Sequence, residues 1–369
     1  MDSATVTLLI DELPADADVL AALEEIEIET SIEEASAFRI RFGIAKTEIG
    51  DWTILESDPF KPFVRVSILL QRGDLPPETI INGYVCEQHV LYADDPGSST
   101  LEVSGLDATS LMNVEEKVVA WPNMPDSVIA TSVFSAYELL PLAVPTTPRL
   151  VEPEGTTIQR GTDIRFLRRL ARRNGFDCYV QPDPLAGVDC GHFQPRDLFG
   201  LPQAVLNVSF GEQTNVSGFT IRYDLTSPAA AQAVGLDAVT NQPQPALAAT
   251  SLEVPLGTEG TLTRATPTPM LRPADTGLPG TAELTDALQG IVERLTWSVI
   301  AEGTVGMDVP ILRPGGLVNV RGCGRIYNGS YFLTRVRHLI EPGGYEQQFE
   351  ARRNAVGMTG AELYVDFAP

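Results

Sequence analysis

The sequence predicts an α+β protein that is mainly β, with two antiparallel β-barrel or sandwich domains and a helical, mixed middle domain inserted. Segments near both ends alternate apolar and charged residues at period two, the pattern of strands with one wet face. One amphipathic, arginine-rich helix stands in the middle of the chain. The 369 residues exceed what one hydrophobic core usually holds, so more than one domain is expected.

The first β domain is predicted to span residues 1–111. Its strands alternate in polarity and suit a meander, with a short helix or turn at Val19–Leu23. An Asn82-Gly83 turn signal lies near the start of the fifth strand. The predicted strands are Thr5–Ile10, Ile26–Glu29, Phe38–Phe42, Val64–Ile68, Ile80–Val90 and Leu101–Val103.

The middle domain, residues 112–204, mixes helical and strand patterns. A helix is predicted from Val128 to Tyr137, capped by Asp126 and Ser127. Because proline cannot continue a helix, the segment containing Pro141, Pro145 and Pro148 is predicted to be a loop.

The clearest helix of the chain follows this loop. Either Thr162 or Asp163 can cap its start, and Asn174-Gly175 supplies a left-handed stop. A short β-prone run, Phe176–Val180, comes directly afterwards, so the helix is expected to turn straight into a strand. The apolar positions recur at helical spacing, and most of the remaining surface is arginine. These arginines are Arg165, Arg168, Arg169, Arg172 and Arg173.

The second β domain is predicted in two pieces, residues 205–240 and 296–356. An arm rich in proline, alanine and threonine and then a helix, together residues 241–295, separate them. Within this interruption Pro243–Pro279 is predicted to be a long loop or extended arm, and Thr285–Thr296 a helix. The predicted strands, turns and polar tail are Val205–Phe210, Gly218–Tyr223, Trp297–Gly303, Pro314–Gly316, Tyr327–Gly329, Gly344–Ala351 and 357–369.

Composition limits the partners. The formal net charge of −23 argues against general affinity for nucleic acid, because phosphates would be repelled at long range. The N-terminus has no basic region ahead of an apolar run, so synthesis in the cytoplasm without a signal peptide is expected. The apolar segment Val128–Val144 contains Glu138 and Pro141 and is too short for a bilayer, so no membrane insertion is expected.

No cofactor or metal is expected. The four cysteines, Cys86, Cys178, Cys190 and Cys323, are scattered and form no C-x-x-C pair. Cys178 and Cys190 could be zinc ligands together with His192, but buried free thiols are the favoured interpretation.

No catalytic residue is assigned, and the chain is not expected to be an enzyme. Phosphate-binding, zinc-protease and serine-hydrolase motifs are absent from the sequence. The histidines His89, His192 and His338 are far apart in sequence and are interpreted as structural. Adjacent carboxylates could serve glycoside cleavage, although solvated ends of strands or helices are the ordinary interpretation. These acidic pairs are Glu24-Glu25, Glu33-Glu34 and Glu115-Glu116.

The arginine-rich helix leaves two alternatives. Its basic face could bind phosphate, or it could be solvated or paired with acidic loops of a neighbouring subunit. The strongly negative net charge favours the second alternative. We therefore take the five arginines as a predicted subunit interface.

Two segments resemble one protein family. Ile158–Phe176, IQRGTDIRFLRRLARRNGF, is similar to the Q-x-x-x-S-D-x-x-F-L-x-R-L-A-x-x-x-G segment of the phage late control gene D family. That family also covers the N-terminal hub part of the VgrG spike proteins of type VI secretion. Leu312–Phe349 resembles the family's closing pattern, with Pro314-Gly315, a Val-x-Val strand, a Tyr-x-Gly-x-Tyr run, His338 and Gly344-Tyr345 in order.

The resemblance implies a structural baseplate hub of a contractile phage tail or a phage-like contractile injection system. Such hubs are homotrimers whose subunits each have two tube-like β domains, giving a pseudo-sixfold ring between the hexameric tail tube and the trimeric spike. The implied partners are a spike protein on a separate chain, a tail tube or tube-initiator protein and other baseplate proteins. Translocated DNA or effector would pass through the lumen without specific binding. An acidic lumen, which would repel such cargo, is a hypothesis.

Two other classes of function remain as alternatives. A phage-tail-associated peptidoglycan or glycan hydrolase would need paired carboxylates in a cleft. A carbohydrate-binding β protein would stay monomeric and bind ligand. The mass of the protein in solution, in the presence of tube and spike proteins, distinguishes the hub from both.

Overall fold

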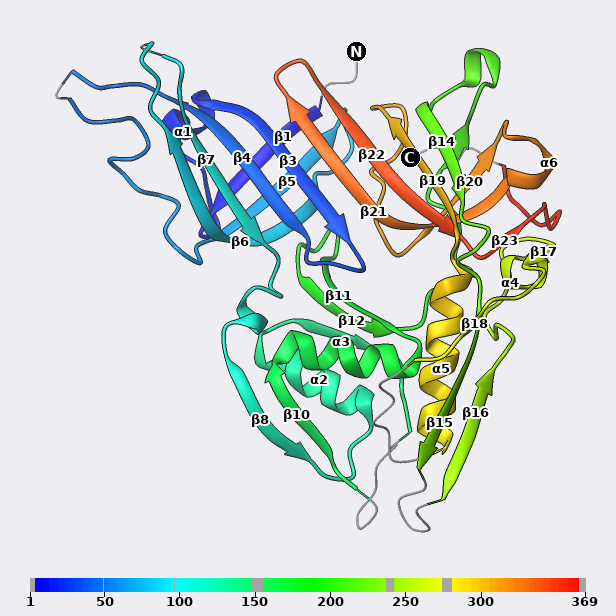
Figure 1. Ribbon diagram of the computed structural model, residues 1–369. Coiled ribbons are helices and arrows are strands. Elements are labelled where there is room, and N and C mark those ends of the chain that lie inside the picture. The colour runs from blue at the N-terminus through cyan, green and yellow to red at the C-terminus, as the bar shows by residue number, and fades with distance from the viewer. Residues whose placement is uncertain are drawn as a thin grey trace.

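The structure is a computed structural model, and it is mainly β. Strands hold 44% of its residues and helices 16%, which confirms the predicted fold class. Figure 1 shows two groups of strands side by side at the top of the view, with the longer helices below them. The structure describes residues 4–48, 50–95, 97–147, 155–236, 242–273 and 281–364.

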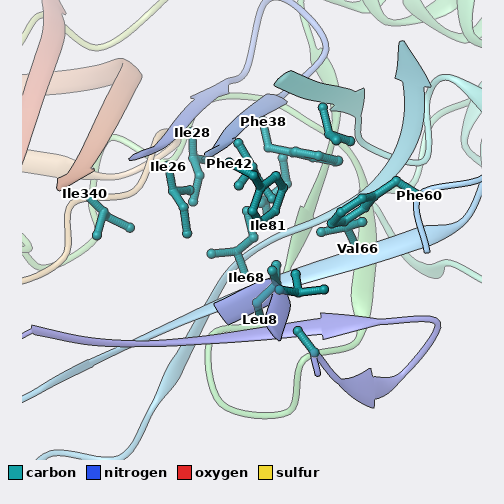
Figure 2. Packing of buried hydrophobic residues seen from close by; sticks show 14 of the residues in the cluster. Leu8, Ile26, Ile28, Phe38, Phe42, Phe60, Val66, Ile68, Ile81 and Ile340 are labelled. Atoms are coloured by element: carbon teal, nitrogen blue, oxygen red, sulfur yellow. The ribbon is translucent and has the colours of Figure 1, made fainter. Parts of the chain in front are cut away.

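The first group of strands, β unit 1, contains the strands predicted for the N-terminal part. In β3 and β4, alternate residues such as Ile26, Ile28 and Phe42 are buried while the glutamates and arginines between them face outward. Figure 2 shows the resulting core. Each such fully buried side chain stabilises the fold by about 1.5–3 kcal/mol. The elements of β unit 1 are β1 (Ala4–Ile10), β2 (Leu13–Pro14), α1 (Ala17–Ala21), β3 (Leu23–Ser31), β4 (Ala37–Ile44), β5 (Arg65–Arg72), β6 (Glu78–Leu91) and β7 (Ser99–Leu106).

The second group, β unit 2, has its own core of smaller side chains, mostly valine, alanine and leucine, around Tyr331 and Phe349. Its sequence is interrupted between β14 and β19, a longer stretch than the predicted interruption of residues 241–295. The elements of β unit 2 are β13 (Val205–Asn207), η2 (Gly211–Gln213), β14 (Ser217–Tyr223), β19 (Val299–Val305), β20 (Leu317–Arg321), α6 (Gly324–Tyr327), β21 (Gly329–Glu341), β22 (Gly344–Arg353) and β23 (Ala355–Val356).

The two β units have the same topology. In β unit 1, β1 pairs with β5, β5 with β6, β6 with β7, β7 with β4, and β4 with β3. In β unit 2, β13 pairs with β20, β20 with β21, β21 with β22, β22 with β19, and β19 with β14. Taken in chain order, the strands correspond one to one. The one difference in direction is the first pairing, which is antiparallel for β1 and parallel for β13.

The correspondence extends to a shared irregularity. The long strand of each unit, β6 or β21, has a bulge at the point where its short partner strand stops. In β unit 1 the pairing with β7 shifts between Val85 and Glu87, and in β unit 2 the pairing with β22 shifts between Leu333 and Arg335. The two bulges thus make Glu87 equivalent to Arg335.

The turn before the short strand is also shared. The backbone N–H of Phe63 donates to Val85 O at 2.9 Å, and that of Gly315 donates to Leu333 O at 2.9 Å. Both Phe63 and Gly315 have positive φ, 61° and 89°. β unit 2 is therefore a structural repeat of β unit 1.

One pairing joins the two units. The second half of β21 pairs antiparallel with β3, in register from Arg335↔Ser31 to Ile340↔Ile26. A single sheet therefore continues through both units in the order β14-β19-β22-β21-β3-β4-β7-β6-β5-β1-β2. Ile340 of β21 packs into the core of β unit 1, as Figure 2 shows.

The middle layer lies below β unit 1 in Figure 1 and has a separate core formed by α2, α3 and two small sheets. One sheet is the β8–β10 pair; the other is β11-β12-β9. The segment predicted to be a proline loop contains a strand, β9, so the loop prediction is wrong there. β9 is an edge strand that pairs parallel with β12, and an edge position tolerates proline. Pro148 lies outside the described residues. The elements are η1 (Leu111–Asn113), β8 (Glu116–Trp121), α2 (Asp126–Ala136), β9 (Leu140–Ala143), β10 (Thr157–Thr162), α3 (Asp163–Asn174), β11 (Asp177–Pro182) and β12 (Asp189–Gln194).

The two predicted helix starts differ in detail from the structure. Helix α2 begins at Asp126 after Pro125, and neither Asp126 nor Ser127 caps it through its side chain. Thr162 does precede α3, but its hydroxyl donates to Asn113 Oδ1 at 2.9 Å rather than capping the helix. The predicted stop is confirmed, since Gly175 has φ 68°.

The interruption of β unit 2 is more ordered than predicted. β15 and β16 form a ribbon, so the expected loop or arm from Pro243 begins as a strand. Its alanines pack against Leu284, Leu288 and Val292 of α5. Residues 274–279 of the expected arm lie outside the described residues. The elements are β15 (Ala230–Leu236), β16 (Pro243–Ala248), β17 (Glu259–Gly260), α4 (Thr261–Arg264), β18 (Met270–Leu271) and α5 (Thr281–Thr296).

Candidate assembly surfaces

The continuous sheet presents one charged face that crosses both β units. Because side chains alternate along a strand, the apolar residues fill the cores and the charged ones collect on the opposite face. Opposite charges face each other across neighbouring strands. This sheet face includes Glu25, Glu27, Glu29, Arg39, Arg41, Glu102, Glu302, Arg335, Arg337, Glu346, Glu350 and Arg352.

Ion pairs run along this face and cross the junction between the units. Arg337 Nε lies 2.6 Å from Glu27 Oε1, and Glu27 also pairs with Arg39. Arg335 lies 3.7 Å from Glu29 and 3.3 Å from Glu350. Burial raises the pKa of Glu27, but hydrogen bonds from Arg337 and Arg39 outweigh it, so the pKa lies below its ordinary value. The face is therefore an alternating network rather than a field of one sign.

Among the strand edges that are open within the described residues, two belong to positions of the β units equivalent to the edges of the junction. In the part of the chain that the structure describes, β14 pairs only with β19, on one side. The second half of β6, from Glu87 to Leu91, pairs only with β7. The segment between β4 and β5 reaches this half of β6 by a side-chain contact, where Gln88 Nε2 donates to Phe60 O at 2.5 Å. Unpaired backbone groups on a strand edge are a template for pairing with another strand.

The open edges are the counterparts of the junction. In the repeat, β14 corresponds to β3, and the second half of β6 corresponds to the second half of β21. Those two counterparts, β3 and β21, pair with each other inside the chain. Each unit therefore has one strand edge paired at the internal junction, β3 or β21, and one equivalent edge open, the second half of β6 or β14.

The five arginines predicted as an interface occupy different surroundings on α3. Arg165 is exposed and reaches Glu116 only at 4.0 Å. Arg169 is exposed, donates to Ile158 O at 2.9 Å and lies over the ring of Phe166.

The other three arginines of α3 face the protein more closely. Arg173 is half-buried, pairs with Asp126, and donates from Nε to it at 2.7 Å. Arg172 is exposed and Arg168 half-buried, and both line a cavity against α5. The set is therefore not one uniform basic face.

The buried titratable residues singled out in the sequence lie within cores. His338 Nδ1 lies 2.9 Å from Tyr345 Oη, and burial lowers its pKa to about 3, with a further contribution from the charge of Arg313. His192 stacks on Tyr179, and burial lowers its pKa to about 4. Burial raises the pKa of the Cys178 thiol to about 12. These groups are held in their neutral forms near pH 7.

The remaining candidates are dispersed. Glu24 and Glu25 both pair with Arg41, at 3.0 and 3.4 Å. Within the described residues, no group of three or more His, Cys, Asp or Glu is arranged to hold a metal ion. No helix in the described ranges is long and apolar enough to cross a membrane.

Comparison with known proteins decides the family. The family model described as the Alg8 N-terminal domain matches residues 2–342. The chain belongs to the Alg8 N-terminal domain family. Comparison of this Alg8 N-terminal domain protein with proteins of curated function finds no match.

Solved structures share the fold of this Alg8 N-terminal domain protein. The tail protein from Neisseria meningitidis MC58 has a TM-score of 0.67 at 14% identity, over 95% of this chain and 97% of that one. The 43 kDa tail protein of prophage MuSo2 from Shewanella oneidensis has a TM-score of 0.64 at 16% identity, over 96% and 100%. The E. coli c3393 protein, a type VI secretion component similar to the T4 tail proteins gp27 and gp5, has a TM-score of 0.57 at 12% identity, over 98% and 80%. The fold is thus that of phage-tail and type VI secretion proteins.

Proposed function

We propose that the protein is a non-enzymatic structural hub of a contractile phage tail or phage-like injection system, and that it assembles as a homotrimeric, pseudo-sixfold ring. One observation carries the proposal: the chain contains two equivalent β units joined by a strand pairing, and both counterparts of that pairing are open on its outside. The fold shared with tail proteins supports the same role.

The proposed ring repeats the internal junction between subunits. The edge of β14 in one copy pairs with the second half of β6 in the next copy, as β3 pairs with β21 within the chain. Three copies then supply six β units and six equivalent junctions, three internal and three between copies. Rings arise when such a head-to-tail contact closes on itself.

The repeat also supplies a register for the proposed contact. Aligning the bulges makes His89 equivalent to Arg337, and aligning the pairings to β4 and β19 makes Arg222 equivalent to Glu29. Because Arg337 faces Glu29 in the internal junction, His89 of one copy is expected to face Arg222 of the next. One position along, Val90 would face Ile221.

The surface chemistry of the open half of β6 fits a covered position. Leu91 and Tyr92 are large apolar side chains at its end, and they are 53% and 58% exposed. Their equivalents, Leu339 and Ile340, are half-buried and buried where β3 covers β21. A neighbouring β14 would cover Leu91 and Tyr92 in the same way.

The charged sheet face is our candidate for the lumen lining. It is continuous across the internal junction, so equal junctions between copies would extend it around the ring. Its alternating ion pairs leave few unpaired charges to hold DNA or an effector in transit. Tail tube, spike and other baseplate proteins are the proposed neighbours along the axis. Among the predicted interface arginines, the exposed Arg165 and Arg169 are available to acidic residues of such neighbours.

A charge swap tests the ring. His89→Arg places like charges opposite each other in the proposed contact and should weaken the trimer at least tenfold. Adding Arg222→Glu recreates the Arg337–Glu29 arrangement and should restore it. Mass measurement by light scattering, alone and with tube and spike proteins, reports the effect. Both side chains are exposed, so the subunit is expected to remain folded.

The matched control is Arg272→Glu, which reverses an exposed charge that lies directly after β18 and belongs to neither β6 nor β14. It should leave the mass unchanged. A monomer under all conditions, including with tube and spike proteins present, would contradict the hub. If the mass stayed that of a trimer in both His89→Arg and the double variant, the contact between copies would lie elsewhere on the subunit.

A further inference from the structure

A cavity of ≈ 410 Å³ lies where the middle layer meets α5 and the end of β3. Helices α3 and α5 form two of its walls and approach closely at Gly290, where an added Cβ would lie 3.0 Å from Arg172 O. Its size is within the range of small-molecule sites. Four arginines line it: Arg168, Arg172, Arg196 and Arg294.

Two of these arginines have buried N–H groups without partners. Nη1 of Arg196 is buried and makes no hydrogen bond, and neither do Nε and Nη2 of Arg168. The Arg196 side chain is only 9% exposed and is held between the rings of Trp297 and Phe332, at 4.4 and 5.5 Å from their centroids. Buried unpaired donors cost free energy, so a site that retains several of them is prepared for an acceptor.

The carboxylates of the cavity are already engaged. Asp177 accepts from Arg196 Nε at 3.1 Å, and Glu33 pairs with Arg352 at 3.1 Å. Glu253 accepts from the indole N–H of Trp297 at 2.6 Å, and Glu293 accepts from Gln289 Nε2 at 3.0 Å. These carboxylates do not accept hydrogen bonds from Arg196 Nη1 or from Nε and Nη2 of Arg168.

The arginines also crowd one another. Burial lowers the pKa of Arg294, and the positive charges of Arg172 and Arg196 lower it further, although Asp177 and Glu293 oppose the shift. In the described part of the chain, Arg168, Arg172 and Arg294 make no ion pair within 4.0 Å. A bound anion would relieve this repulsion and satisfy the donors together.

We propose that this cavity binds the oxyanion of a small molecule, a phosphate or carboxylate group, through Arg168, Arg172, Arg196 and Arg294. The planar guanidinium matches the paired oxygens of both groups. The bound anion would link α3 to α5 beside the end of β3. This site is independent of the proposed ring, because all of its lining comes from one chain.

The test titrates the full chain with inorganic phosphate and, separately, with citrate by isothermal calorimetry in dilute buffer. Sodium chloride of equal ionic strength is the reference. Saturable binding in the millimolar range or tighter is expected for at least one anion, and the two arms distinguish phosphate from carboxylate. Heat no greater than that of the chloride reference in both arms would overturn the proposal.

Variants locate the binding. Arg168→Gln keeps the aliphatic stem but removes the orphan donors, and it should weaken binding at least tenfold. Arg165→Gln, an exposed arginine three residues earlier that does not line the cavity, is the matched control and should bind as the unaltered chain does. Equal binding by both variants would overturn the assignment to this cavity.

A third variant is expected to strengthen anion binding, an effect that misfolding would not produce. Burial raises the pKa of Glu253 to about 7, so the titration is run at pH 8, where this carboxylate is ionised. There Glu253→Gln removes a negative charge from the cavity wall while its amide oxygen can still accept from Trp297, so it should tighten anion binding several-fold. Weaker or unchanged binding in this variant would contradict an anion held beside Glu253. Thermal unfolding without anion checks that each variant is folded.

Discussion

The two β units share a topology and differ in what secures their ends. In β unit 1 the last strand runs into Asp107, which is buried and accepts hydrogen bonds from Ser36 and Thr109. At the equivalent position of β unit 2 stands Arg353, also buried, which donates to backbone carbonyls. One fold thus uses a buried anion and a buried cation for the same task of tying loops to the end of a strand. Topology and backbone pairing persist where side chains diverge.

The largest expected change in the free energy of unfolding comes from replacing the buried Arg353. Arg353→Met should lower the free energy of unfolding by about 3–5 kcal/mol, because the carbonyls of Leu256, Asn328 and Gly357 lose their donor inside the protein. Urea unfolding followed by circular dichroism measures it. The neighbour Arg352 points outward, so Arg352→Met should cost about 1 kcal/mol or less. Equal losses for the two variants would refute the anchoring role.

The buried Asp107 should make the stability of the protein depend on pH. Burial raises the pKa of Asp107 to about 6, although hydrogen bonds from Thr109 and Ser36 oppose the shift. The folded state therefore holds this proton more tightly than the unfolded state, whose pKa is near 3.8. The resulting stability, about 3 kcal/mol, is present below pH 3.8 and is lost as the pH rises through 6.

Asp107→Asn cannot titrate and tests this dependence. The stability of the unaltered chain minus that of the variant should fall between pH 4 and pH 7, as measured by urea unfolding at both values. A constant difference across this range would show that Asp107 titrates normally. Arg353→Met should show no such pH dependence, which separates the two anchors.

The smallest expected changes in stability come from substitutions in the turn that the two β units share. Gly315→Ala should cost about 1–2 kcal/mol, since alanine resists positive φ and its Cβ would lie 2.7 Å from Tyr179 Oη. The equivalent Phe63 already carries a side chain at φ 61°. Phe63→Gly should therefore stabilise β unit 1 by about 0.5–1 kcal/mol, measured by thermal unfolding. Destabilisation by Phe63→Gly would mean that the Phe63 ring outweighs the backbone strain.

The strands of the two β units could be predicted because their inward positions are large and apolar. Ile26, Ile28 and Phe42 alternate with charges, and this pattern identifies a strand with one buried face. Helix α3 was equally readable from its apolar spacing and Gly175. The ribbon β15–β16 was missed because its buried residues are alanines, such as Ala231 and Ala246, which carry no strand signal.

The repeat and the cavity could not be read from the sequence. Equivalent positions such as Glu87 and Arg335 differ in charge, so only backbone pairing reveals their relation. Arg168 lies three residues from Arg165 on the same helix, yet one lines a cavity and the other faces solvent. That difference arises from α5, which is more than a hundred residues further along the chain.

The pairing of β3 with β21 has a consequence for how the chain folds. Thr30 donates its hydroxyl proton to Val336 O across a separation of 306 residues. Contacts this distant in sequence form late, so a nascent chain leaves β3 as the bare edge of β unit 1 until nearly the whole protein has been synthesised. Within β unit 1, Arg41 and Arg39 of β4 already pair with Glu25 and Glu27, so Glu29 is the glutamate of β3 that β4 leaves unpaired. Repulsion between Glu29 residues would oppose the pairing of β3 with β3 in two nascent copies. Once β21 is in place, its Arg335 pairs with Glu29, so the residue that opposes the wrong pairing also favours the right one.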